Sequence, residues 1–385
     1  MIYKKYKNIY DKFIEHYKNV HVNPWHEINE EELKIIETDL INKMDIEDEY
    51  TFKYFVDFII KKLSGKSDAH TRYEAVSPIP ANFRIYDNEV FVNFPDTLKY
   101  SKLQSINGID INCIIEELED VITYGTKGKR KYELEKSLFN RYILFGLPSL
   151  RGSNGLCFEV QKKDETIEKI IFNKNEDYSE EMFDYKKYRY GNPGEYRFEE
   201  NCLIYTHSSV QINFKEKIEL SIQKLKFEDL SNIDTIIIDI RGNTGGHAGL
   251  NKILMDYLKD CIDKKLICLT DYRVFSGGRY ALRDLINLGA TTIGEEIGTP
   301  INCYGNSDWI NVENHYFSSS SCYFSPFVGW SASSKEEFKN EVTEELLIPY
   351  IFKPDILTVQ NKDDYMKGFD SILEYAIGYN KTKRR

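Results

Sequence analysis

Two short apolar runs, each ended by glycines and then followed by helical spacing, constrain the fold of this chain most. They are DTIIIDI at residues 234–240 and KLICLT at residues 265–270. Short runs rich in β-branched and aliphatic residues are typical of strands buried on both faces. Helical spacing follows at residues 248–258 and 279–286. Strands that alternate with helices in this way predict a parallel sheet and therefore an α/β core.

The glycines after the first run indicate a place for negative charge. The segment DIRGNTGG fills residues 239–246 and ends in Gly245 and Gly246. Glycine permits positive φ and lets a ligand approach the main chain closely. Amide groups at a strand-to-helix turn point outward, and such donors stabilise the charge that develops in acyl transfer. Beside them, Arg241 is more typical of an ion-pair partner of Asp239 than of a substrate clamp.

The second run leads to FSGG at residues 275–278, which places Ser276 at the start of a helix. A serine there is usually an N-cap. The flanking glycines and the similar first segment favour a nucleophile instead, and a serine nucleophile needs a neighbouring base. Among the seven histidines, His70 stands out in GKSDAHT at residues 65–71, directly after an amphipathic helix that ends near Leu63.

Taken in order, several segments resemble the motifs of the S41 serine peptidases, a family that includes the C-terminal processing peptidases and the tricorn core protease. These segments are DAHT at 68–71, DIRGNTGG at 239–246, FSGG at 275–278, GATTIGE at 289–295 and KPDI at 353–356. The resemblance implies a ClpP/crotonase-like fold of repeated ββα units. It also implies Ser276 as nucleophile and His70 as general base. The implied oxyanion donors are the amides of Gly277 and Gly246, with Gly245 as neighbour.

The family divides between a serine-lysine dyad and a serine-histidine arrangement. The dyad lysine would lie in GEEIGTPIN at residues 294–302, which contains no lysine, so the resemblance implies the histidine version. A glutamate that orients the histidine would fall near Ile348, which cannot serve. Four other carboxylates are candidates for this third member, although each alone is more typical of a solvated side chain: Glu295, Glu296, Glu344 and Glu345.

Three parts are expected along the chain. Residues 1–71 form a helical N-terminal lobe that supplies His70, residues 72–190 form a PDZ-like or strand-rich middle region, and residues 191–385 form the catalytic core. Within the middle region, SKLQSINGIDI at 101–111 resembles part of a PDZ domain, while its Asn-Gly pair is a hairpin signal in its own right. Because no carboxylate-binding loop precedes it, a degenerate PDZ-like insert is expected. Residues 164–200 are polar and predict a linker or an exposed lobe, and residues 370–376 predict a closing helix.

The composition of the chain disfavours some classes of binding partner and indicates its compartment. A net charge of −11 disfavours nucleic acid and anionic membrane surfaces. No segment approaches the ~20 apolar residues needed to span a bilayer. Seven cysteines without C-x-x-C spacing, and the lack of a secretory leader, predict a cytoplasmic protein unless the sequence is a trimmed, exported form. Metal-ligand spacing is absent as well, so we expect no metal or other cofactor.

We therefore expect a serine peptidase that acts on peptide or protein substrates through an acyl-enzyme. Two alternatives stay open. One is a non-catalytic peptide-binding or ligand-binding protein on the same fold, which an unoriented base would favour. The other is a crotonase-like acyl-thioester enzyme, because a pair of amides also stabilises an enolate and fold alone does not separate these chemistries. Ser276 speaks against the latter, since that chemistry requires carboxylates where this chain has serine and glycine.

Overall fold

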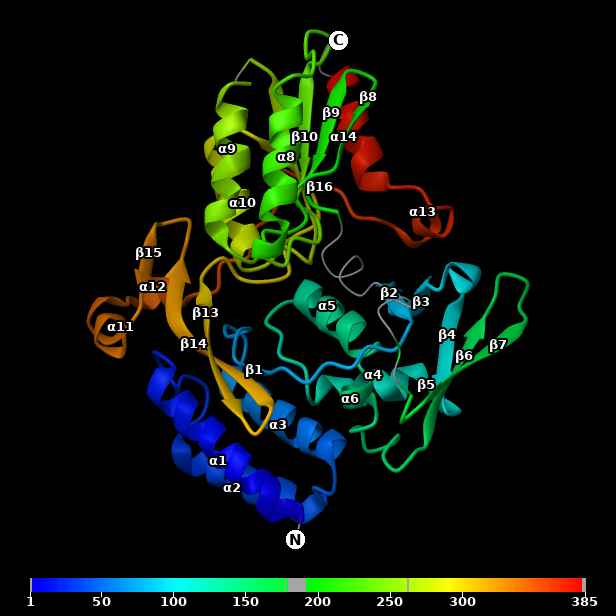
Figure 1. Cartoon of the computed structure of the whole chain (residues 1–385), viewed down its shortest axis with the longest axis vertical. Helices are drawn as coiled ribbons and strands as arrows, with labels where there is room; N and C mark the ends of the chain where they lie inside the picture. The colour runs from blue at the N-terminus through cyan, green and yellow to red at the C-terminus, as the bar shows by residue number, and fades with distance from the viewer. Residues whose placement is uncertain (1, 177, 179–191, 262, 383–385) are drawn as a thin grey trace. The chain divides into compact units, whose positions relative to one another are not determined.

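The computed structural model describes residues 2–176, 178, 192–261 and 263–382 as a mixed α/β protein (Figure 1). The chain divides into two compact units. Unit 1 consists of Met1–Phe183 with Asn302–Pro349, and unit 2 of Asp184–Ile301 with Tyr350–Arg385. Each unit is thus assembled from two separate stretches of the chain.

Unit 1 begins with helices, as the sequence predicted for this part of the chain. These are α1 (Ile2–Val20), α2 (Glu30–Lys43) and α3 (Glu49–Ser64). Asn29 caps α2 and Asp48 caps α3, each through a capping box that satisfies amides of the first turn. The expected apolar face of α3 is buried, with Phe52, Ile59 and Leu63 fully covered. Helix α3 ends at Gly65, which has a φ of 53° and turns the chain toward the segment of His70.

A four-stranded antiparallel sheet packs with these helices. Its strands are β1 (Arg72–Tyr73), β13 (Cys303–Val312), β14 (His315–Ser325) and β15 (Trp330–Ala332), and α11 (Lys335–Glu341) and α12 (Glu344–Leu347) follow. Phe317 of β14 stacks on Phe13 of α1, with ring centroids 4.9 Å apart. Strand β13 also bridges to Asp68 through Tyr304. The lobe and this hairpin therefore hold the His70 segment between them.

The middle region contains a second antiparallel sheet in unit 1, with strand order β2-β3-β4-β6-β7. Its strands are β2 (Asn82–Tyr86), β3 (Glu89–Phe94), β4 (Lys102–Ile106), β5 (Ile109–Asp110), β6 (Gly155–Gln161) and β7 (Ile167–Asn173). The helical segments are η1 (Asp96–Leu98), α4 (Ile111–Glu119), α5 (Lys127–Ser137) and α6 (Arg141–Leu144). The predicted hairpin is confirmed: Asn107 and Gly108, both with positive φ, join β4 to β5.

Unit 2 contains the predicted parallel sheet, with strand order β16-β12-β11-β10-β9-β8. The strands are β8 (Tyr196–Glu199), β9 (Cys202–Thr206), β10 (Thr235–Asp239), β11 (Lys265–Thr270), β12 (Thr291–Gly294) and β16 (Ile356–Leu357). All neighbouring pairs are parallel except β8 with β9. The strands predicted at 234–240 and 265–270 are thus confirmed as β10 and β11.

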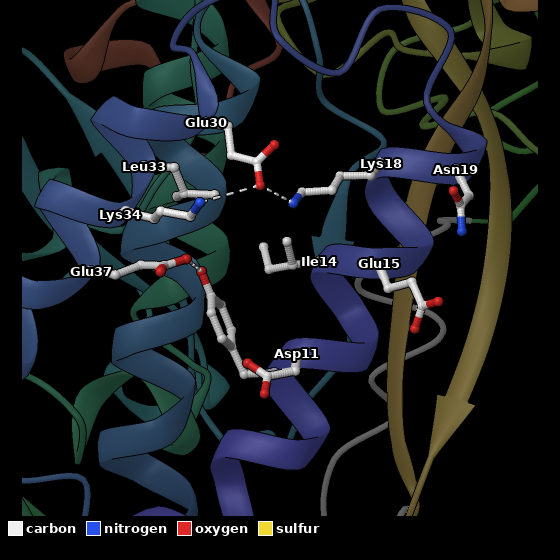
Figure 2. A pocket seen from close by; sticks show the side chains of 10 residues that line it. Asp11, Ile14, Glu15, Lys18, Asn19, Glu30, Leu33, Lys34 and Glu37 are labelled. Carbon is white, nitrogen blue, oxygen red and sulfur yellow. Dashed lines mark hydrogen bonds and ion pairs between the residues drawn. The ribbon is translucent and has the colours of Figure 1, made fainter.

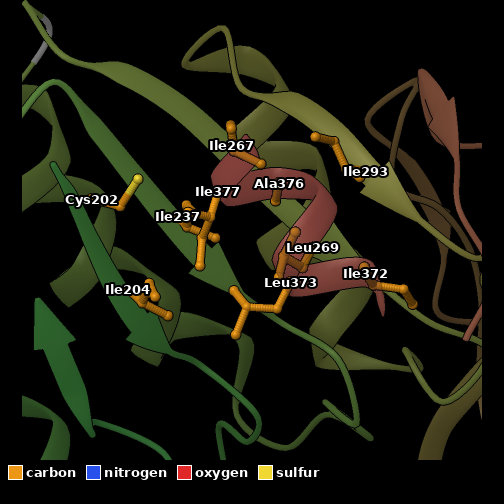
Figure 3. Close-up of a cluster of buried hydrophobic side chains, with 10 residues drawn as sticks. All are labelled: Cys202, Ile204, Ile237, Ile267, Leu269, Ile293, Ile372, Leu373, Ala376 and Ile377. Carbon is orange, nitrogen blue, oxygen red and sulfur yellow. The ribbon is translucent and has the colours of Figure 1, made fainter. Parts of the chain in front are cut away.

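Helices connect these strands and cover the sheet. They are η2 (Ile212–Phe214), α8 (Lys215–Leu225), η3 (Ala248–Leu250), α9 (Asn251–Lys259), α10 (Gly277–Asn287), α13 (Lys362–Met366) and α14 (Ser371–Thr382). Figure 3 shows α14, the predicted closing helix, lying on the strands and packing Leu373 and Ile377 against Ile237 and Ile267. The next residue on β10, Ile238, points to the opposite face and is fully buried, so the sheet is covered on both sides.

The polar stretch at 164–200 is only partly described, because residues 177 and 179–191 lie outside the described residues. Its ends are strands β7 and β8, so the expected linker is wrong there. Most side chains of β7 are exposed or half-buried, and an edge strand of this kind gives little hydrophobic period. Along the described parts of the chain, no helix combines the length and the apolar character needed to cross a bilayer.

Candidate active site

Ser276 lies in unit 2, at the sharp turn between β11 and α10. Its φ of 48° and ψ of −119° are a backbone conformation that residues with a side chain rarely adopt. It occupies the N-cap position, yet its side chain makes no capping hydrogen bond to the helix. Strained backbone of this kind costs about 1–3 kcal/mol and concentrates at functional sites. A serine presented on a strained strand-to-helix turn is the arrangement known from nucleophile elbows.

Hydrogen bonds on both sides of Ser276 hold this conformation. The amide of Phe275 donates to the backbone oxygen of Asn243 at 2.9 Å. The amide of Gly278 donates to Phe275 at 2.9 Å, and that of Arg279 to the carbonyl of Ser276 at 3.0 Å. The surroundings therefore fix the peptide groups before and after the serine, as a strained residue requires.

The glycine turn predicted from the sequence lies directly against Ser276. A Cβ built on Gly245 would lie 2.7 Å from the Cβ of Ser276 and 2.6 Å from the amide nitrogen of Gly277. A Cβ on Gly246 would lie 2.4 Å from the backbone oxygen of Val210. Both glycines have positive φ, 98° and 130°. Only glycine fits at these two positions, and the two segments singled out in the sequence meet there.

The amides of this turn differ in whether they are already used. The amide of Gly245 donates to Oδ1 of Asn243 at 2.9 Å. Within the described ranges, no residue accepts a hydrogen bond from the amide of Gly246 or from that of Gly277. A Cβ on Gly277 would lie 3.1 Å from the nitrogen of Gly246, so these two amides are close neighbours. Together they can donate to one developing oxyanion.

The arginine of the glycine turn has the structural role that the sequence predicted. Nε and Nη2 of Arg241 donate to the two carboxylate oxygens of Asp239 at 2.9 and 2.7 Å. The same guanidinium forms a second two-pronged pair with Asp370, at 2.7 and 2.8 Å. This arginine thus ties the start of the turn to the residue before α14.

His70 lies in unit 1, in the loop between α3 and β1, and only 6% of its surface is exposed. Its amide and that of Thr71 donate to Oδ1 of Asp68, at 3.0 and 3.1 Å. The hydroxyl of Ser318 donates to its carbonyl oxygen at 2.5 Å. The backbone around the imidazole is therefore held by a buried aspartate and by β14.

The ring of His70 has a defined tautomer. Nδ1 lies 3.1 Å from the backbone oxygen of Tyr304. A carbonyl oxygen only accepts, so Nδ1 carries the proton and Nε2 keeps the lone pair. In this tautomer Nε2 can act as a base, which is the orientation that a triad carboxylate normally secures.

Asp68 anchors the loop as a buried anion. Burial alone would raise the pKa of Asp68, but hydrogen bonds from His21 and Ser320 hold that pKa well below its usual range. Nε2 of His21 lies 3.2 Å from Oδ2, and the hydroxyl of Ser320 lies 2.6 Å from Oδ1. Nδ1 of His21 accepts from the amide of Asn23, so its Nε2 is the donor to Asp68. Burial lowers the pKa of His21, which keeps that ring neutral.

The four candidate glutamates lie in different settings. Glu295 is nearly buried after β12, and its Oε1 accepts from the amide of Gln360 at 3.3 Å. Glu296 pairs loosely with Lys353, with 3.6 Å between the charged atoms. Glu344 and Glu345 lie exposed in the first turn of α12, where carboxylates favour the helix dipole.

A separate cavity of about 360 Å³ opens between α1 and α2 in unit 1 (Figure 2). It is lined by charged side chains, among them the ion pair of Lys18 with Glu30, whose charged atoms are 2.6 Å apart. None of the site residues predicted from the sequence lines it. Across the described residues, no three histidine, cysteine or acidic side chains gather as they would around a metal ion.

Several residues that hold the two turns around Ser276 and the His70 segment by hydrogen bonds were not singled out in the sequence. Asn243 and Asn251 bind the glycine turn and the serine turn, and His21 and Tyr304 hold the His70 segment. The contacts of His21 and Tyr304 join residues 47 and 234 positions apart. Asn243 stood inside a recognised motif, and its position beside two glycines was the one signal available.

No family model and no curated protein matches this chain. Solved structures do match this chain. Mature CPAF has 10% identity to this chain and a TM-score of 0.61, and the match covers 92% of this chain and 93% of CPAF. Mature CPAF complexed with lactacystin has 11% identity and a TM-score of 0.63, with 97% and 96% covered. A likeness at this identity shows a shared fold along nearly the whole of both chains.

Proposed function

We propose that this chain, which has the fold of CPAF and motifs that resemble those of S41 peptidases, is a serine peptidase. One observation carries the proposal: Ser276 is held at positive φ against the Gly245–Gly246 turn, beside the amides of Gly246 and Gly277, which donate to no other group within the described ranges. A surface serine that merely caps a helix needs neither the strain nor the close glycines. The substrate class is a peptide or a protein.

The proposed reaction uses His70 as base, Ser276 as nucleophile and two backbone amides as oxyanion donors. Nε2 of His70 removes the proton of the Ser276 hydroxyl as its oxygen attacks the peptide carbonyl. The carbonyl oxygen becomes negative and receives hydrogen bonds from the amides of Gly277 and Gly246. The imidazolium then gives its proton to the leaving amine, and water releases the acyl group by the same steps in reverse order. The Tyr304 carbonyl accepts from Nδ1 throughout and stabilises the imidazolium.

His70 and Ser276 belong to different units, and catalysis requires that Nε2 reach the serine hydroxyl in the working enzyme. The tautomer of His70 supports this role, because the basic nitrogen is the one left without the Tyr304 bond. The group that orients His70 is the third member of the site. The Tyr304 carbonyl bonds Nδ1, and the candidate carboxylates remain Glu295, Glu296, Glu344 and Glu345.

We assign the parallel sheet of unit 2 to a ClpP/crotonase-like core. Its strand-helix-strand crossovers, β9-α8-β10 and β11-α10-β12, support this assignment. We assign the sheet of β2, β3, β4, β6 and β7, with α4, to a degenerate PDZ-like insert, which the Asn107–Gly108 hairpin supports. The division at residues 1–71, 72–190 and 191–385 belongs to the same proposal.

A fluorophosphonate probe tests the function. The wild-type protein is incubated with the probe, the labelled residue is mapped by mass spectrometry, and the Ser276→Ala and His70→Ala variants are compared. We expect the label on Ser276 and a strong loss of labelling in both variants. A protein that binds peptides and never labels is the non-catalytic alternative. Turnover of an acyl-CoA by Ser276→Ala indicates the crotonase-like one.

A further inference from the structure

We propose that His207 is a positioning residue that fixes both oxyanion donors, one through Asn243 and the other through Asn251. This inference rests on the function proposed above and deepens it. His207 lies just after β9 in unit 2, and its side chain is fully buried. The reaction steps make no use of it, although it bonds to both asparagines that hold the site.

The first connection runs from the backbone of His207 to the glycine turn. Its carbonyl accepts from Nδ2 of Asn243 at 2.7 Å. Oδ1 of the same amide accepts from Gly245 at 2.9 Å, which sets the turn that presents the Gly246 amide. The backbone oxygen of Asn243 also accepts from Phe275. Because Asn243 is fully buried, its amide has one orientation that satisfies all of these bonds.

The second connection runs from the imidazole of His207 to the serine turn. Nδ2 of Asn251 donates to the carbonyl of Gly277 at 3.2 Å. Its Oδ1 therefore faces Nε2 of His207, which lies 2.9 Å away. An amide oxygen only accepts, so Nε2 of His207 carries the proton. The ring thereby fixes the orientation of the Asn251 side chain. Asn251 in turn holds Gly277, whose amide is the other oxyanion donor.

The other ring nitrogen of His207, Nδ1, is in an unfavourable environment. Nδ1 of His207 is buried and has no hydrogen-bond partner among the described residues. A buried acceptor without a partner destabilises the fold, and such an atom calls for an explanation. Burial also lowers the pKa of His207, so the ring stays neutral. The neutral, rigid ring therefore presents a single N–H donor, which it directs at Asn251.

Three variants separate positioning from packing. His207→Leu removes the ring donor and keeps an apolar volume. His207→Gln restores an N–H donor. Asn251→Asp keeps the acceptor that faces His207 and removes the donor to Gly277. Met255→Leu is the control, because it changes a buried side chain of the same helix with little change of volume. Each is measured for kcat and KM on a quenched peptide, and for amide hydrogen exchange at residues 242–250 and 275–281.

We expect His207→Leu and Asn251→Asp to lower kcat by about 10–100-fold with KM within about threefold. This is less than the ~10²–10³ that losing an oxyanion donor outright costs, because the donor is displaced and not removed. Exchange at residues 275–281 should become faster in these variants and stay unchanged in Met255→Leu. Residues 242–250 serve as the internal comparison, because the carbonyl of His207 that holds Asn243 is main chain and remains in every variant. His207→Gln should recover part of kcat.

The result that overturns the inference is a folded His207→Leu or Asn251→Asp protein with wild-type kcat and wild-type exchange at residues 275–281. A rise in KM alone also overturns it, since that indicates substrate binding. If His207→Leu does not fold, Asn251→Asp decides by the same readouts. A wild-type protein that never labels at Ser276 ends the proposed function, while the exchange comparison still decides the positioning role by itself.

Discussion

Nδ1 of His70 lies 3.1 Å from the backbone oxygen of Tyr304, so a main-chain carbonyl holds this imidazole in the tautomer of a base. In a serine-histidine-aspartate triad a carboxylate has this role, and replacing it by an amide costs about 10⁴ in kcat. A carbonyl cannot be protonated and cannot be removed by mutation of its side chain. The orientation of His70 is thus built into the pairing of β13 with the loop after α3.

A first prediction concerns the glutamates of α12. Glu344→Gln and Glu345→Gln should leave kcat within about twofold of wild type, because both carboxylates are exposed and the Tyr304 carbonyl already bonds Nδ1. Steady-state kinetics on a peptide substrate measures this. A loss of about 10³-fold or more in either variant would show that α12 supplies the triad acid.

A second prediction concerns Asp68. In Asp68→Asn, an amide nitrogen would face the Nε2–H of His21, so two buried donors would oppose each other. We expect a loss of about 1–3 kcal/mol of unfolding free energy, measured by denaturant titration, together with a lower kcat because the His70 loop loosens. Ser320→Ala removes a single neutral donor to the same carboxylate and serves as comparison. We expect it to lose about 1 kcal/mol. Equal stability of Asp68→Asn and wild type would contradict the anchoring role.

The sequence predicted the unit 2 sheet well because its strands are apolar throughout and end at glycines. Thr235–Asp239 and Lys265–Thr270 are strands as expected, and the glycine turn and Ser276 meet where the carboxyl ends of parallel strands lie. The exact use of each amide could not be predicted. Whether Gly245 or Gly246 is occupied depends on which way the buried side chain of Asn243 points.

The surroundings of His70 could not be read from the sequence for a different reason. The residues that hold its segment are His21, which follows α1 and bonds Asp68, and Tyr304 of β13, which bonds the ring. Both lie far from His70 in the chain, and neither stands in a recognisable sequence pattern. Strand β13 pairs with β14, and β14 pairs with the short strand β1 that directly follows the His70 segment. Pairing between distant strands is set by tertiary packing, and local spacing carries little information about it.

A third prediction concerns acid. Burial lowers the pKa of His21 and of His207, so each ring takes up a proton more readily in the unfolded chain. Their contribution to stability is fully present above the unfolded pKa of about 6.5 and is lost as pH falls below it. We expect the unfolding free energy to fall between pH 6.5 and 5, by up to about 1.4 kcal/mol per pH unit for each ring.

His21→Gln tests the share of one ring, since it should flatten this pH dependence while lowering stability at pH 7.5. Urea titrations at a series of pH values measure both quantities. His16→Gln is the matched control, because that histidine lies on α1, shortly before His21 in the chain, and its Nε2 lies at an exposed contact with Asp308, 3.2 Å from the backbone oxygen and 3.7 Å from Oδ1. An unchanged pH slope in His21→Gln would contradict the neutral, buried ring.

A fourth prediction separates backbone strain from contact at the glycine turn. Gly245→Ala places a methyl group 2.7 Å from the Cβ of Ser276 and 2.6 Å from the nitrogen of Gly277, at a φ of 98°. Gly289→Ala, in the same unit, has a similar φ of 85° and would meet no atom within 4 Å. Both variants carry strain of about 1–2 kcal/mol. We expect only Gly245→Ala to lose fluorophosphonate labelling of Ser276, by at least about 10²-fold, because it pushes the serine turn away from the amide donors. Comparable labelling of the two variants, at matched folded fractions, would mean that the contact between the two turns does not set the reactivity of the serine.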